Sequence, residues 1–301
     1  MNSGITPLYG RDFTTCIRGL AVLLIAIFHV LLEWDGMPRY INLTGSVCVA
    51  TFLFFSGYGI HESYKKNGLQ DYWHKRFKRI ILPYTLFITL LIPFTSDYNL
   101  KEYLLDITYI HSSYWFIEFL VWNYIIYWIA QKYFSKYLFT IFLLFAIFGV
   151  NFLMQMEAEQ VLSFPAGILL SKHIDSMRLL SKKYLVLLAT GCFVFGSFFL
   201  LLKEIPTVHA YKGSVAYNYI LLMIKLPMGI TLSLIPLFIP FVLRSRLLYL
   251  CGVASLEIYL VHLALLPLAQ QQPLSLLLFI LLNIILVYVL YKLDNVIISR
   301  L

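Results

Sequence analysis

With 301 residues, of which 60% are hydrophobic and only 13% charged, this chain carries about half the charge of a typical soluble domain. Its mean hydropathy of +0.81 and its apolar runs of about 20 residues predict membrane-spanning helices and exclude the short alternating strands of an outer-membrane barrel. The net charge of +8 does not indicate nucleic-acid binding, because lysine and arginine collect on the cytoplasmic loops of membrane proteins.

Ten apolar stretches predict ten transmembrane helices, and so an all-α, polytopic membrane protein. They are 17–35, 41–62, 80–95, 112–131, 137–155, 159–171, 184–202, 215–243, 247–268 and 273–298. The first stretch lacks a small-x-small cleavage site, so we expect it to remain as a span rather than to act as a signal peptide. No repeat or soluble segment divides the chain, and we expect residues 1–301 to form one integral-membrane domain.

Two of the predicted spans are irregular. The span 159–171 is short and contains Pro165, so we expect a crossing that is buried among other helices. The span 215–243 is long and contains Pro227, Pro236 and Pro240. Since proline removes a backbone donor, we expect this span to be kinked or partly broken.

The distribution of basic residues predicts the orientation in the membrane. If the N-terminus is cytoplasmic, 18 of the 23 lysines and arginines fall on the inner side, four on outer loops, and one, Lys225, within a span. Basic residues are enriched on the cytoplasmic side of membrane proteins. Both termini and the polar segment 63–79 are therefore predicted to be cytoplasmic.

The four cysteines all lie in or beside apolar runs. They are Cys16, Cys48, Cys192 and Cys251, and no paired spacing suggests a disulfide or a zinc site. We expect them to be small buried hydrophobic residues, and we expect no metal site.

The first span contains two ionisable residues, Arg18 and His29. Eleven residues in a helix turn about 20° past three full turns and rise ~16.5 Å, so both side chains lie on one face. Ionisable groups inside a membrane tend to mark function. Arg18 could instead reach the headgroups and His29 could bond a neighbouring helix, but their shared face predicts a polar groove that enters from the cytoplasm.

The segment "YWHKRFKRIILPY", residues 72–84, carries a basic cluster just before the third span. Such a cluster often binds anionic lipid headgroups. Alternatively, Arg76 and Arg79, spaced i and i+3, could bind a cytoplasmic ligand that carries phosphate.

Two further stretches place polar or small residues inside spans. In "TFLFFSGYGI", residues 51–60, Ser56 and Gly57 interrupt a run of aromatic residues, and Gly57 could serve close helix packing or leave room for a ligand. In "LCGVASLEIYLVH", residues 250–262, Tyr259 and His262 can share a helix face, whereas Glu257 points about 140° away from His262.

Glu118 lies within the fourth span and needs a partner. We expect a structural ion pair between Glu118 and Lys225 in the eighth span.

Five motifs, taken in order, resemble those of the acyltransferase 3 family of integral-membrane acyltransferases. "CIRGLAVLLIAIFHV" is similar to the family's first helix, with its arginine and histidine. "FLFFSGYGI" is similar to a phenylalanine-rich Ser-Gly-aromatic stretch that here contains Tyr58. "RFKR" at 76–79 is similar to the Arg-x-x-Arg motif. "SYWFI", with Trp115, resembles the start of a middle helix, and "LEIYLVH" resembles a late tyrosine–histidine signature.

This resemblance implies transfer of an acyl group, usually acetyl, from cytoplasmic acyl-CoA to a hydroxyl of a surface polysaccharide or other glycan in the bacterial inner membrane. It implies that His29 carries the transfer chemistry. Arg18, Arg76, Arg79, Ser56 and Gly57 would bind the donor. Supporting polar residues would be Tyr58, Trp115, Glu118, Tyr259 and His262. Acyl-CoA is then a co-substrate, no cofactor is permanently bound, and a glycan or lipid-linked sugar is the other partner.

Two departures from the family's pattern bear on the acceptor. Gly45-Ser46 stands where the family often has two glycines, and Glu257 stands where a small residue is common.

A different class of function also fits the composition. A transporter or flippase of a lipid-linked glycan would likewise have many spans, a proline-broken helix and buried ionisable residues. Against it, the sequence shows no inverted repeat and its basic residues gather on one side.

Overall fold

The computed structural model describes residues 8–37, 41–91, 100–110 and 112–300, and every regular element in this part of the chain is helical. The first half contains α1 (Arg11–Leu32), α2 (Ile41–Asn67), α3 (Tyr72–Arg76), the π-helical turn η1 (Phe77–Ile81), α4 (Leu82–Leu91), α5 (Leu100–Thr108), α6 (Trp115–Tyr133), the 3₁₀ turn η3 (Ser135–Tyr137) and α7 (Leu138–Phe152).

The second half continues with shorter pieces between three long helices. It contains α8 (Gln155–Ala158), α9 (Ser163–Lys172), α10 (Ile174–Leu179), α11 (Lys182–Glu204), α12 (Pro206–His209), α13 (Val215–Ser233), η4 (Ile235–Leu237), α14 (Phe241–Arg244), α15 (Arg246–Val253), α16 (Ser255–Ala264), η5 (Leu266–Leu268) and α17 (Pro273–Arg300).

Six of the described helices are long and apolar enough to cross a membrane, and the pair α15–α16, bent by 77°, could form a seventh crossing. The chain is therefore a polytopic, all-helical membrane protein. The structure does not show the ten predicted spans. The other three, 80–95, 112–131 and 159–171, correspond to α4, α6 and α9, and residues 92–95 lie outside the described part.

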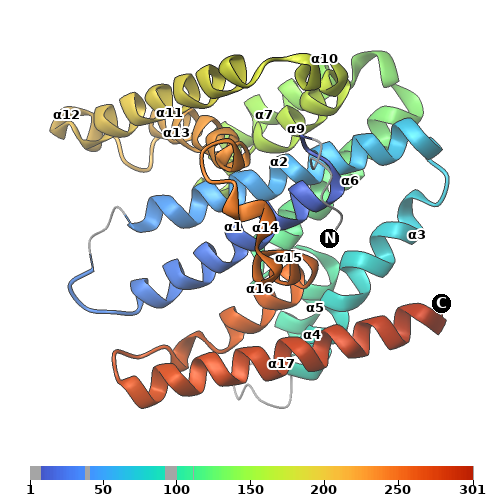
Figure 1. The fold of residues 1–301 in the computed structure, drawn as a ribbon, viewed down its shortest axis with the longest axis vertical. Coiled ribbons are helices and arrows are strands. Elements are labelled where there is room, and N and C mark those ends of the chain that lie inside the picture. The colour runs from blue at the N-terminus through green and yellow to red at the C-terminus, as the bar shows by residue number, and fades with distance from the viewer. Residues whose placement is uncertain (1–7, 38–40, 92–99, 111, 301) are drawn as a thin grey trace.

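The long helices form a bundle with α1 and α2 in its middle (Figure 1). The helix α11 lies on one side of this central pair and α17 on the other, and α17 ends toward the end of the bundle where α2 passes into α3. Which end faces the cytoplasm stays a prediction from the charge pattern.

The two irregular spans are shorter than their apolar runs. As expected, the run 215–243 is broken, because α13 ends at Ser233 and is followed by η4 and α14, while Pro227 is accommodated inside α13. The helix α9 has only 10 residues and buries Phe164 and Ile168 completely. Ten residues rise ~15 Å, about half the thickness of the hydrocarbon core, so α9 is too short to cross alone.

Two close helix crossings depend on glycine. A Cβ atom at Gly57 in α2 would collide with the carbonyl oxygen of Phe164 in α9, and one at Gly167 would collide with that of Phe54. Small residues at such crossings let helices approach each other closely in membranes.

Gly19 and Gly252 create a similar crossing between α1 and α15, against the carbonyl oxygens of Leu248 and Thr15. This second crossing holds α15, and the bend into α16, beside the polar face of α1.

Candidate active site

A cavity of about 950 Å³ opens between α1, α2, the α3–η1 segment, α6 and the α15–α17 wall. Its lining includes a set of lysines and arginines from four separate parts of the chain. They are Arg11, Arg18, Lys66, Lys75, Arg76, Lys78, Arg79 and Arg178. The fold therefore brings Arg18 of α1 together with Arg76 and Arg79, which the sequence separates by more than one helix.

Within the described residues, none of these three arginines forms an ion pair with a carboxylate. The closest polar contact of Arg18 is a long one of 3.5 Å to the hydroxyl of Thr15, and its Nε atom is buried without a hydrogen-bond partner. Because a buried cationic donor without a partner is costly, the arrangement favours binding of an anion in the cavity.

Aromatic rings hold Arg76 in place. Its guanidinium lies 4.5 Å from the centre of the Tyr72 ring and 5.8 Å from that of Tyr124, and it donates to the Tyr72 carbonyl at 3.2 Å. Arg79 follows in the π-helical turn η1, a local distortion that is frequent at functional sites. These contacts fix Arg76, and Arg79 lines the same cavity three residues further on.

The polar face of α1 runs along the cavity as the helical period requires. Arg11, Thr14, Thr15, Arg18 and Ile25 all line it. His29 lies one turn beyond Ile25 on this face. His29 is not itself a lining residue, so it lies just past the end of the cavity that Ile25 lines.

His29 is hydrogen-bonded to His262, with 2.9 Å between Nδ1 of His29 and Nε2 of His262. The Nδ1 atom of His262 lies 2.7 Å from the carbonyl oxygen of Ile258. Since a carbonyl can only accept, this Nδ1 carries the proton of a neutral His262, and its Nε2 accepts from Nδ1–H of His29. The Nε2 atom of His29 is then left with a free lone pair.

Tyr259 connects the cavity to this histidine pair. It lines the cavity, and its ring centre lies 5.9 Å from that of His262 in an edge-on arrangement. Tyr259 and His262 thus share a face of α16, as their spacing predicts. Glu257, two residues before Tyr259, also lines the cavity.

The remaining predicted residues divide between the cavity and its surroundings. Ser56 and Tyr58 line the cavity, whereas Gly57 faces α9 at the crossing described above. The geometry of Gly57 thus matches the packing alternative rather than room for a ligand. Trp115 and Glu118 lie outside the lining; Glu118 is buried and accepts from the backbone N–H of Ser112 at 2.6 Å.

The predicted ion pair between Glu118 and Lys225 is wrong. Lys225 lies 4.0 Å from the carboxylate of Glu159 and hydrogen-bonds to the Ser46 hydroxyl. Apolar runs predict the helices but not which helices become neighbours, so the partner could not be chosen from the sequence.

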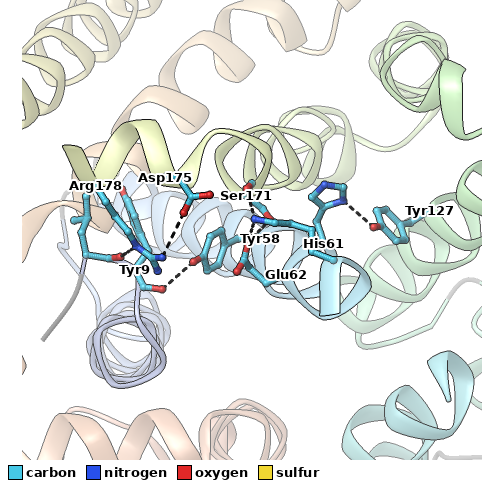
Figure 2. A network of polar contacts seen from close by, with 10 residues as sticks. Tyr9, Tyr58, His61, Glu62, Tyr127, Ser171, Asp175 and Arg178 are labelled. Atoms are coloured by element: carbon cyan, nitrogen blue, oxygen red, sulfur yellow. Dashed lines mark hydrogen bonds and ion pairs between the residues drawn. The ribbon is translucent and has the colours of Figure 1, made fainter. Parts of the chain in front are cut away.

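A polar network ties the segment before α1 to the wall of the cavity (Figure 2). The hydroxyl of Tyr58 donates to the carbonyl of Tyr9 at 3.0 Å, and Arg178 of α10 donates to that of Leu8 at 3.1 Å. Sequence reasoning missed Tyr9 and Arg178, because only the fold brings them beside α2.

Sequence reasoning also missed Asp294, which lines the cavity. A carboxylate inside an apolar run is itself a sign of a functional site.

The part of the chain that the structure describes contains no candidate metal site. No three histidine, cysteine, aspartate or glutamate side chains there are placed to hold one ion.

A family model for the acyltransferase domain of the acyltransferase 3 family matches residues 12–292. The chain belongs to the acyltransferase 3 family. Searches of curated proteins and of solved structures find no match. Since the matched region contains both the arginine-lined cavity and the histidine pair, the protein is a multi-pass membrane acyltransferase that requires an acyl donor and an acceptor.

Proposed function

We propose that this acyltransferase moves an acyl group, acetyl in the first instance, from cytoplasmic acyl-CoA to a hydroxyl of a surface polysaccharide or other glycan. Its place would be the bacterial cytoplasmic membrane. The observation that supports the proposal most is the cavity. It is lined by Arg18, Arg76 and Arg79, which have no carboxylate partners among the described residues. The His29–His262 pair adjoins the end of the cavity that Ile25 lines.

The basic part of the cavity suits the phosphates of coenzyme A. Guanidinium groups form charge-assisted, often bidentate hydrogen bonds with phosphate oxygens, and this geometry favours arginine. Tyr72 and Tyr124 keep Arg76 oriented before a ligand arrives, which lowers the entropy cost of binding.

The free Nε2 of His29 suits a general base. It would take the proton of the acceptor hydroxyl as the oxygen attacks the thioester carbonyl carbon, so that a C–O bond forms and the C–S bond breaks. The thiolate that leaves would take the proton back from the imidazolium, giving free coenzyme A and the acylated acceptor. The same lone pair could alternatively attack the thioester first and form an acyl-histidine.

The test uses the purified protein in lipid nanodiscs with acetyl-CoA and a fragment of the host's surface glycan. Release of coenzyme A together with acetylated glycan in mass spectra is the expected result. The alternative function, a transporter or flippase of a lipid-linked glycan, would instead move the glycan between leaflets without consuming acetyl-CoA. Family membership favours the enzyme.

A further inference from the structure

Two of the acidic residues that line the cavity differ from the third in having no cationic partner among the described residues. Besides its eight basic residues, the cavity is lined by three acids, Glu62, Glu257 and Asp294. Glu62 is already engaged, because its carboxylate accepts from Lys65 at 2.8 Å and from the Ser171 hydroxyl at 2.7 Å. Glu257 and Asp294 form no ion pair with any lysine or arginine in the part of the chain that the structure describes.

Asp294 of α17 is deeply buried and unsatisfied. It is only 2% exposed, and neither oxygen of its carboxyl group has a hydrogen-bond partner among the described residues. Glu257 of α16 is 7% exposed and lines the same cavity. A buried carboxyl group without a donor is costly, so a ligand that donates a hydrogen bond to Asp294 would be stabilised there.

The position of the pair indicates which part of a ligand it meets. Glu257 precedes His262 by five residues on α16, a rise of ~7.5 Å, with cavity-lining Tyr259 between them. The unpaired arginines belong to α1 and the α3–η1 segment. The two carboxyl groups therefore belong to the wall that leads to the histidine pair, apart from the basic cluster.

An acyl-CoA with its phosphates on the arginines and its thioester at His29 would extend its pantetheine arm toward Tyr259, the cavity-lining residue that contacts His262, and so along this wall. That arm is uncharged and carries two amide N–H groups and a hydroxyl, which are donors of the kind that Asp294 lacks and that the Glu257 carboxyl group can also accept.

We propose that Glu257 and Asp294 form a subsite that accepts hydrogen bonds from the pantetheine arm of the acyl donor. This inference rests on the proposed function, because it assumes that the cavity binds acyl-CoA. It assigns a role to Glu257, one of the positions where the chain departs from the pattern of its family, and to Asp294, which no motif includes.

The experiment measures binding to the full-length protein in nanodiscs by isothermal titration with three probes. Coenzyme A contains both phosphates and arm, pantetheine contains only the arm, and adenosine 3′,5′-bisphosphate contains only the phosphate-bearing nucleoside. The variants are Asp294→Leu, which keeps the branched shape of the side chain, and Glu257→Met, which keeps its length; both remove the carboxyl acceptors. The matched control is Glu33→Gln, at an exposed position just after the C-terminal end of α1.

We expect each cavity variant to weaken coenzyme A and pantetheine about tenfold or more, while adenosine 3′,5′-bisphosphate and the control are unchanged. Asp294→Leu should also raise the unfolding temperature without ligand, because it removes a buried unpaired carboxyl group. A residue with a merely structural role would lower that temperature instead.

Unchanged affinity for coenzyme A and pantetheine in both variants would overturn the inference and leave the proposed function standing. Equal weakening of all three probes would overturn it too, because the effect would then not be specific to the arm. If the wild-type protein binds no coenzyme A and transfers no acyl group, the proposed function itself fails.

Discussion

The Nδ1 atom of His29 lies 2.9 Å from the Nε2 atom of His262, although 233 residues separate them in the chain. His262 is almost completely buried and is itself fixed by the Ile258 carbonyl, so it can orient the imidazole of His29 and select its tautomer. The geometry therefore predicts different roles for the two histidines, with His29 presenting the reactive nitrogen and His262 positioning it.

The first prediction concerns His29. We expect His29→Ala and His29→Gln to lower the rate of transfer ~10²–10⁴-fold, the usual contribution of a general base, because neither replacement can shuttle a proton. Binding of acyl-CoA should persist, since Arg18 and the α3–η1 cluster remain. Transfer by His29→Gln close to the wild-type rate would reduce this histidine to a packing role. Trapping of labelled acyl-enzyme from acetyl-CoA alone would favour the acyl-histidine route over general-base catalysis.

A second prediction separates positioning from chemistry at His262. His262→Phe cannot accept from Nδ1–H of His29, whereas His262→Gln offers a side-chain carbonyl that can. We expect His262→Phe to lower kcat about 10–100-fold, the range seen for groups that orient metal-binding histidines, with KM for acyl-CoA little changed. His262→Gln should recover part of this loss. Equal kcat values for the two variants, both folded, would contradict the positioning role.

The third prediction concerns the basic wall of the cavity. Changing Arg76 and Arg79 together to glutamine should mainly raise KM for acyl-CoA, because a hydrogen bond to a charged group contributes ~1.5–3 kcal/mol, or about tenfold or more per contact. Lys132→Gln, a basic residue outside the cavity lining, is the control. If the double variant inserts correctly and binds the donor as well as the wild type, the cluster serves only topology or lipid contact.

Much of the site follows from local periodicity, and what does not is the pairing of distant helices. The helical period alone puts Arg18 and His29 on one face, and it puts Tyr259 and His262 together. No local rule brings His262 to His29, because their contact depends on the crossing of α1 with α15 and on the 77° bend between α15 and α16. The π-helical turn that carries Arg79 is equally absent from the sequence pattern.

The structure does not show the ten predicted spans, for a related physical reason. An apolar run shows that a segment can lie in lipid, but it does not show how far its helix extends before proline or a neighbouring helix ends it. The run 159–171 therefore predicted a crossing where the structure has the short helix α9, packed against α2. Likewise, the apolar pattern could not show that Lys225 would lie beside Glu159 rather than Glu118.

The fourth prediction tests the α2–α9 crossing. Gly57→Ala adds a Cβ that meets the Phe164 backbone and should destabilise the protein by ~1–3 kcal/mol, as overpacking usually does. Gly59→Ala, two residues further along α2, has no atom within 4 Å of the added carbon and should stabilise the helix slightly, by ~0.5–1 kcal/mol. Thermal unfolding of both variants in the same detergent compares them. If the two shift equally, close packing at Gly57 does not limit stability.

The last prediction tests the orientation that the basic residues imply. In a background without the four native cysteines, a cysteine at Lys66, near the end of α2, should resist a membrane-impermeant thiol reagent in intact cells. One at Lys101, in α5, should label, because it is predicted to lie outside. Both positions are exposed in the protein, so protection reports the membrane rather than burial. Both cysteines should label after the cells are permeabilised. Labelling of Lys66→Cys and protection of Lys101→Cys in intact cells would reverse the topology, and the arginine-lined cavity would then face away from the cytoplasmic pool of acyl-CoA.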